Sequence, residues 1–173
     1  MLTVVVPNGF LFGDGVSARI KEQLLRNFDL HTIVRLPNGV FTPYTPIPTN
    51  LLFFARSQPT TDIWYYEHTL PERQKSYSKT RPMQFDEFVP LIEWWDASQR
   101  VENEHAWKVR VDNVLKYDEN KNLLSVNLDI KNPSRKEDLE HMPPHELAKS
   151  ILNKEKQIAE LMNEIESLLA KGK

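Results

Sequence analysis

Two apolar runs, each closed by the same Pro-Asn-Gly turn, constrain the fold of this chain more than any other feature. The first run covers residues 2–6 and ends at Pro7-Asn8-Gly9; the second covers residues 32–36 and ends at Pro37-Asn38-Gly39. Short runs of this kind are typical of strands that are buried on both faces of a sheet. A buried strand at residues 2–6 needs neighbours on both sides, so we expect that the chain begins inside a larger domain.

An amphipathic helix is predicted between these strands. After a loop at residues 10–15, the apolar residues Ile20, Leu24 and Phe28 follow one another at four-residue spacing, which predicts a helix over residues 16–28. A strand, a helix and a strand in this order predict a right-handed crossover between parallel strands.

A third apolar run changes the direction of the sheet. Residues 50–56 follow a proline-rich loop at residues 40–48, and no helix lies between them and the second strand. The connection is too short for a crossover, so the third strand should return antiparallel. Residues 63–66 predict a further strand. The fold class is therefore α/β.

The rest of the chain is more mixed. Residues 85–95 predict a helix that Pro90 disturbs, and residues 109–130 are expected to be irregular. We divide the chain into an α/β part, an irregular and helical extension, and a helical tail, at residues 1–70, 71–140 and 141–173.

The tail carries a heptad pattern of apolar residues. Lys154 is the one polar residue at a d position of this pattern. The apolar stripe needs a partner, because a lone helix of this kind is marginal in water. The partner is its own domain, another chain, a second copy of this chain or a helix in absent sequence. The predicted docking residues are Leu147, Ile151, Ile158, Leu161, Ile165 and Leu168.

Charge and composition exclude several classes of function. The net charge of −2 rules out an overall basic field, so any contact with DNA must be local. Separately, residues 76–83 are a basic, polar connector with Lys75, Lys79 and Arg81. The chain has no cysteine, which excludes disulfides and thiolate metal sites. It has no apolar run of the roughly 20 residues that a membrane helix needs. We expect a soluble, cytoplasmic protein.

Common active-site motifs are weak or missing. Gly13, Gly15 and Ala18 match a G-x-G-x-x-A dinucleotide fingerprint, but Pro7 already ends the strand and no acidic residue closes the next strand to hold a ribose. His141 and His145 have helical spacing but two prolines between them, so no metal site is predicted. The glycines more simply make a turn, and the chain contains no self-sufficient active site.

The order of several segments resembles the carboxy-terminal part of the modification (M) subunits of type I restriction–modification systems. These subunits are adenine-specific DNA methyltransferases of the N-P-P-F/Y class. The likeness spans nearly the whole chain. The segments that carry it are residues 4–12, 33–41, 47–54, 79–82, 107–109 and 127–133.

This resemblance implies the carboxy-terminal half of a class I, Rossmann-like S-adenosylmethionine (SAM) methyltransferase sheet, with strands 5, 6 and an antiparallel strand 7, followed by a helical tail. The glycine-rich SAM loop and the N-P-P-F/Y motif are absent. Asn132-Pro133 is followed by Ser134, so it cannot replace that motif. No catalytic or cofactor-binding residue can be carried over, and SAM is expected only in the full-length protein.

The resemblance also implies a role in N6-adenine methylation of DNA. In related enzymes an aromatic residue in the loop after strand 6 stacks on the extruded adenine, and Phe41 matches that place, with Tyr44 as a weaker candidate. The implied partners are DNA, a specificity (S) subunit, on which the helical tail docks, and a restriction (R) subunit. The alternative is a stand-alone α/β interaction module with a coiled-coil helix and no catalytic role.

Overall fold

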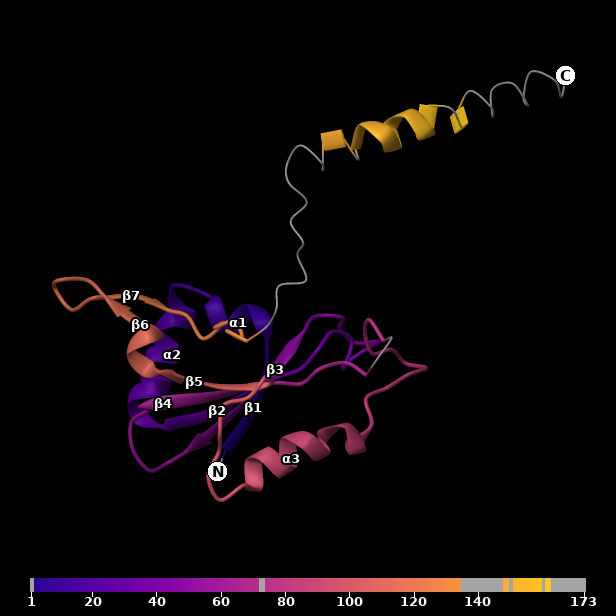
Figure 1. The fold of residues 1–173 in the computed structure, drawn as a ribbon. Helices are drawn as coiled ribbons and strands as arrows, with labels where there is room; N and C mark the ends of the chain where they lie inside the picture. Colours follow the sequence, from indigo (N-terminus) through magenta and orange to yellow (C-terminus); the bar gives the residue numbers. More distant parts are fainter. Residues whose placement is uncertain (1, 72–73, 135–147, 150, 160, 163–173) are drawn as a thin grey trace, which may run out of the picture. The chain divides into compact units, whose positions relative to one another are not determined.

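A computed structural model describes residues 2–71, 74–134, 148–149, 151–159 and 161–162. The chain divides into two compact units, Met1–Arg135 and Lys136–Lys173. The first unit holds a five-stranded sheet and a two-stranded sheet (Figure 1). Its elements are β1 (Leu2–Pro7), α1 (Asn8–Phe12), α2 (Val16–Asn27), β2 (Asp29–Arg35), β3 (Thr49–Ala55), β4 (Asp62–Glu67), η1 (Phe85–Phe88), α3 (Val89–Asp96), β5 (Ala106–Arg110), η2 (Val111–Asn113), β6 (Leu115–Tyr117) and β7 (Leu123–Val126).

The main sheet has the strand order β1-β3-β2-β4-β5. Both β1 and β2 pair antiparallel with β3, so they run in the same direction, and β2 also pairs parallel with β4. The antiparallel return of β3 confirms the prediction from the short connection between residues 36 and 50. This arrangement is the expected carboxy-terminal half of a class I methyltransferase sheet, in which an antiparallel strand lies between two strands of common direction.

The expectation that the first strand is buried on both faces is wrong for this chain. Leu2 is 55% exposed and Val5 is 52% exposed. In the described residues, β1 lies at the margin of the sheet and pairs along one edge only, with β3. Its side chains therefore have a neighbouring strand on one side only, whereas β2, between β3 and β4, buries Ile33 and Val34 completely.

Neighbouring residues of the central strands point to opposite faces of the sheet, so each face carries its own apolar cluster. Ile33 and Tyr65 belong to one apolar cluster, which includes Leu11 of α1 and Leu25 of α2. The residues that follow them along the strands join a second cluster with α3. Helices α1 and α2 thus cover one face, and α3 covers the other (Figure 1).

Three local expectations need correction. The predicted loop at residues 10–15 is partly the short helix α1. Residues 109–130, expected to be irregular, contain β6, β7 and the end of β5. The helix predicted over residues 85–95 is divided into η1 and α3 just before Pro90, which lies in the first turn of α3, where a missing backbone N–H costs nothing.

In the second unit, residues 148–149, 151–159 and 161–162 are helical. Of the predicted docking residues, Ile151, Ile158 and Leu161 are exposed on this helix. Leu147, Ile165 and Leu168 lie outside the described residues. Within the described parts of both units, no helix has the length and apolar character to cross a membrane.

Candidate functional site at the carboxyl ends of the parallel strands

The carboxyl ends of β1, β2 and β4 lie at one edge of the sheet because these three strands share a direction. At this edge, the main-chain N–H of His68, just after β4, donates to the carbonyl of Arg35 in β2 at 3.0 Å. Asn50 of β3 is buried and donates to the side chain of Asn8 at 3.2 Å. Ligand sites of open α/β sheets form at such edges. The loops that follow the carboxyl ends of these strands are therefore the candidate site.

The loop between β2 and β3 carries both predicted target-base residues. Its turns are closed by hydrogen bonds from the Thr42 N–H to the Gly39 carbonyl, at 3.0 Å, and from the Tyr44 N–H to the Phe41 carbonyl, at 2.9 Å. The peptide bond between Thr42 and Pro43 is cis. Phe41 is 38% exposed and Tyr44 is 93% exposed. The backbone of the loop is therefore held while both rings remain accessible.

Tyr77 holds the start of this loop in place. Its main-chain N–H donates to the Asn38 carbonyl at 3.0 Å. Gly39 has a φ of +83°, and a Cβ built on it would collide with the carbonyl oxygen of Tyr77. Only glycine meets both demands at once, a left-handed backbone and a close approach to another main chain. The Asn38-Gly39 turn thus packs directly against the main chain of Tyr77.

The side chain of Tyr77 belongs to a buried polar cluster with His68 and Glu87. The Tyr77 hydroxyl donates to Glu87 Oε2, and its oxygen lies 3.2 Å from His68 Nε2. A hydroxyl has a single proton, so His68 Nε2 must be the donor to the Tyr77 oxygen. The other carboxylate oxygen of Glu87 accepts the Gln84 main-chain N–H at 2.7 Å.

Burial sets the protonation of this cluster. It lowers the pKa of His68, although Glu87 acts in the opposite direction. Burial and the hydrogen bond to Glu87 both raise the pKa of Tyr77. The imidazole is therefore neutral and the phenol protonated near pH 7. Sequence reasoning missed these residues, because positions 68, 77 and 87 follow no known motif and meet only in the folded chain.

The segment after β7 is also fastened to this edge of the sheet. Arg35 pairs with Asp129 at 2.5 Å and donates to the Ile130 carbonyl at 2.9 Å. Lys21 of α2 is 1% exposed, and its ammonium group donates to the carbonyls of Leu11 and Val126 at 2.9 and 2.5 Å. Burial lowers the pKa of Lys21. Arg35 and Lys21 thus each stabilise the packing of segments that are distant in sequence.

The remaining motifs of the sequence have structural roles. Helix α1 separates β1 from Gly13 and Gly15, so these glycines form the turn into α2 and do not follow a strand directly. The Asn132 side chain donates to the Glu104 carbonyl at 2.7 Å and accepts the Ser134 N–H at 2.8 Å. Its amide is thus used within the fold and is not presented to a ligand.

No group of three or more potential metal-ligating side chains occurs among the described residues. His141 and His145 lie outside them.

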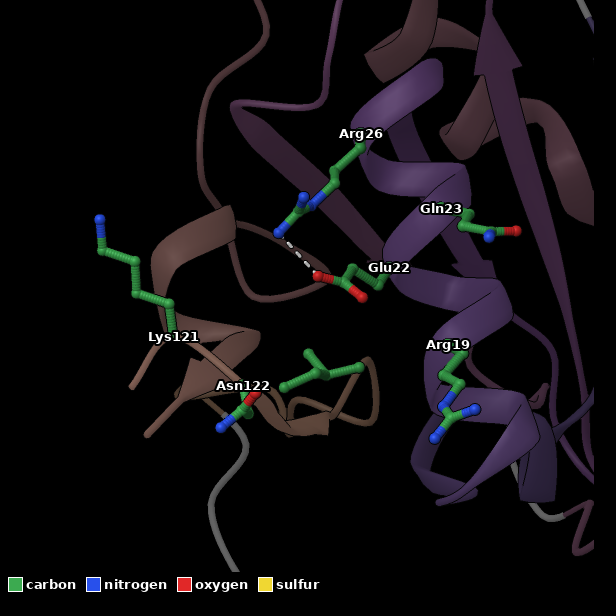
Figure 2. A pocket seen from close by; sticks show the side chains of 7 residues that line it. Arg19, Glu22, Gln23, Arg26, Lys121 and Asn122 are labelled. Atoms are coloured by element: carbon green, nitrogen blue, oxygen red, sulfur yellow. Dashed lines mark ion pairs between the residues drawn. The ribbon is translucent and has the colours of Figure 1, made fainter. Parts of the chain in front are cut away.

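A separate basic pocket of about 490 Å³ lies between α2 and the turn of the β6–β7 hairpin (Figure 2). Within it, Arg26 is paired with Glu22 at 2.7 Å. No residue of the loop at positions 37–48 lines this pocket, so it is distinct from the candidate site. Its lining residues are Arg19, Glu22, Gln23, Arg26, Lys121, Asn122 and Leu123.

Comparison with known proteins identifies the family. Residues 1–138 match the family of N-6 DNA methylases. The chain is 47% identical over 171 residues to the methylase subunit of the type I restriction enzyme EcoEI from Escherichia coli, an alignment that covers 96% of this chain and 33% of that protein. The chain therefore spans about a third of the length of this relative.

Two solved structures of type I restriction–modification proteins are also similar to this chain. A modification subunit of a putative type I restriction enzyme from Vibrio vulnificus YJ016 is 60% identical, with a TM-score of 0.76 over 80% of this chain and 28% of that one. A structure reported for complex assembly and conformational transition of the type I R-M system is 38% identical, with a TM-score of 0.68 over 99% of this chain and 36% of that one. The chain therefore belongs to the N-6 DNA methylase family, among the methylase subunits of type I restriction enzymes.

Proposed function

We propose that this chain forms part of the target-base site of a type I methylase subunit, which methylates N6 of adenine in DNA with SAM as the methyl donor. One observation carries the proposal. The loop after β2 is held by hydrogen bonds and presents Phe41 at the edge where the parallel strands end. We place the base that is modified at this edge, because ligand sites of open α/β sheets form beyond the carboxyl ends of their parallel strands.

The chemistry explains why an aromatic side chain suits this place. The amino group of adenine cannot be reached inside a duplex, so the base must be rotated out of the stack. A ring that stacks on the extruded base offsets part of the lost stacking, by about 1–3 kcal/mol. Phe41 is a better candidate than Tyr44, because it is 38% exposed against 93%, so its side chain has less conformational freedom to lose when a base stacks on it.

The methyl transfer itself needs residues that this sequence does not contain. The glycine-rich loop for SAM and the N-P-P-F/Y motif are both missing from the chain. We therefore assign no residue of this chain to catalysis or to SAM, and we expect the isolated chain to be inactive.

The second unit is proposed to be the docking arm for the S subunit, in a complex that also contains the R subunit and DNA. The exposed apolar residues Ile151, Ile158 and Leu161 support this assignment, because a helix with an exposed apolar stripe needs a partner. The same exposed residues also favour the alternative function, a stand-alone module that associates through its helix. Self-association of the isolated chain, with no effect of its variants on methylation, would favour the module.

The test of the proposed function is Phe41→Ala in the complete methylase subunit assembled with its partners. Loss of the stacking contact should lower kcat/KM for DNA about 5–150-fold, while the Kd for SAM and the Tm stay unchanged. Leu124→Ala is the control: Leu124 is 63% exposed and lies on β7 of the β6–β7 hairpin, so this variant should methylate normally. An unchanged methylation rate for Phe41→Ala would remove the proposal.

A further inference from the structure

We infer that residues 75–81 form a DNA-backbone contact, in which Lys79 and Arg81 bind phosphodiester groups beside the extruded adenine. The inference rests on the proposed function, because it places DNA at the loop that carries Phe41. It adds a second contact surface of different chemistry, one that binds the phosphate backbone and not the base.

The position of this basic segment is set by main-chain contacts. The Tyr77 N–H donates to the Asn38 carbonyl, and Gly39 packs against the main chain of Tyr77. Directly after Tyr77, the chain makes a tight turn in which Ser78 and Arg81 exchange two main-chain hydrogen bonds of 3.1 Å. Lys79 and Arg81 therefore lie on a closed turn whose first residue follows the anchor of the target-base loop.

The buried side chain of Tyr77 also fixes the position of this basic segment. Tyr77 is 2% exposed, and its hydroxyl is bonded to Glu87 and His68. A basic turn attached to a buried, bonded tyrosine keeps its place relative to the loop at residues 37–48. Preorganised cations lose less entropy when they bind than cations on an unanchored segment.

The charge of the segment matches a phosphate backbone. Lys75, Lys79 and Arg81 are all exposed, and residues 75–81 contain no acidic residue. Across residues 2–71 and 74–134, none of these three cations has an ion-pair partner within 4.0 Å. The whole chain has a net charge of −2, so a positive segment at this place is a local feature and not part of a general basic field.

The basic pocket on α2 provides the comparison. Its Arg26 is already neutralised by Glu22, and none of its residues belongs to the target-base loop or its anchor (Figure 2). Its two other cations, Arg19 and Lys121, are thus a matched pair of basic residues on an unrelated surface of the same unit.

The experiment measures DNA affinity of the complete, assembled methyltransferase as a function of salt concentration. Each phosphate contact contributes about 0.9 to the slope of log Kd against log salt. Lys79→Ala/Arg81→Ala should therefore lower the slope by about 1.8, and weaken binding to DNA with and without the recognition site by a similar factor, about 5–50-fold. Lys79→Arg/Arg81→Lys should restore the slope, and Arg19→Ala/Lys121→Ala should leave it unchanged.

Three outcomes would overturn the inference. An unchanged salt slope in the Lys79→Ala/Arg81→Ala variant would show that these cations do not meet phosphates. Loss of subunit assembly with intact DNA affinity would assign the surface to a protein partner. An equal loss in the Arg19→Ala/Lys121→Ala control would indicate a general charge effect. Because the readout is binding and not methylation, failure here is distinguishable from failure of the Phe41 proposal.

Discussion

Arg35, the last residue of β2, and Asp129, three residues after β7, form an ion pair with 2.5 Å between Nη2 and Oδ1. The pair joins the carboxyl edge of the main sheet to a segment 94 positions further along the chain. Because Arg35 also donates to the Ile130 carbonyl, its guanidinium holds two consecutive residues of that segment. A segment that is distant in sequence is therefore held against the edge of the sheet that carries the candidate site.

Asp129→Asn is predicted to destabilise the first unit. The two side chains are only 19% and 26% exposed, so the substitution leaves a half-buried guanidinium without its counter-charge and should cost about 1–3 kcal/mol of unfolding free energy. Asp112→Asn is the control, since the Arg110–Asp112 pair is 76% and 73% exposed and should contribute less than about 1 kcal/mol. Urea unfolding measures both; equal losses would contradict the structural role of Asp129.

Gly39→Ala is predicted to cost more than about 2 kcal/mol of unfolding free energy. A side chain at φ +83° is strained, and the added Cβ would force the turn away from the carbonyl of Tyr77. In Gly9→Ala the Cβ meets nothing within 4 Å, and alanine is the better helix former by about 1 kcal/mol, so this control should be neutral or stabilising. A thermal-unfolding comparison decides; a Gly39→Ala protein as stable as the wild type would show that the Asn38-Gly39 turn tolerates displacement.

The buried histidines are predicted to make the fold less stable in mild acid. Burial lowers the pKa of His68 in the folded chain below the ordinary value of about 6.5, so the unfolded chain binds more protons as the pH falls through that value. The stability is thus present above about pH 6.5 and is lost below it, by at most about 1.4 kcal/mol per pH unit for one proton.

His68→Gln should reduce this pH dependence of the unfolding free energy between pH 7.5 and 5.5. The pKa of His31 is lowered by burial in the same way, so His31→Gln/His68→Gln should flatten the profile further. Urea midpoints at several pH values provide the measurement. Profiles that run parallel in all three proteins would mean that neither imidazole has to be neutral in the folded chain.

The helical arm has its own prediction. Ile158→Asp/Ile165→Asp places charges on the apolar stripe and should abolish assembly with the S subunit, because a carboxylate without a partner is strongly disfavoured in a buried helix interface. Co-purification of the two subunits is the readout, and Lys156→Glu, which changes an exposed residue on the face opposite the apolar stripe, is the control. Normal assembly of the double variant would indicate that the stripe is covered by its own chain.

Local apolar patterns were enough to determine the elements that surround the site. The four-residue spacing of Ile20, Leu24 and Phe28 predicted α2, which spans Val16–Asn27. The run at residues 32–36 and the short connection to residue 50 predicted β2 and the antiparallel direction of β3. These features depend on residues close together in sequence and on chain geometry. The order of the apolar runs and turns also supported the family, which the comparisons confirm.

Tertiary structure decided everything that depends on distant partners. Strand β5 was not predicted, although Lys108 and Arg110 are exposed and Val109 is buried, because five residues are too few for that alternation to stand out. Nothing local indicates that Lys21 is buried, or that His68, Tyr77 and Glu87 meet. Their burial is tolerated only because carbonyls, a carboxylate and a hydroxyl from other segments supply hydrogen bonds, and those partners exist only once the sheet has formed.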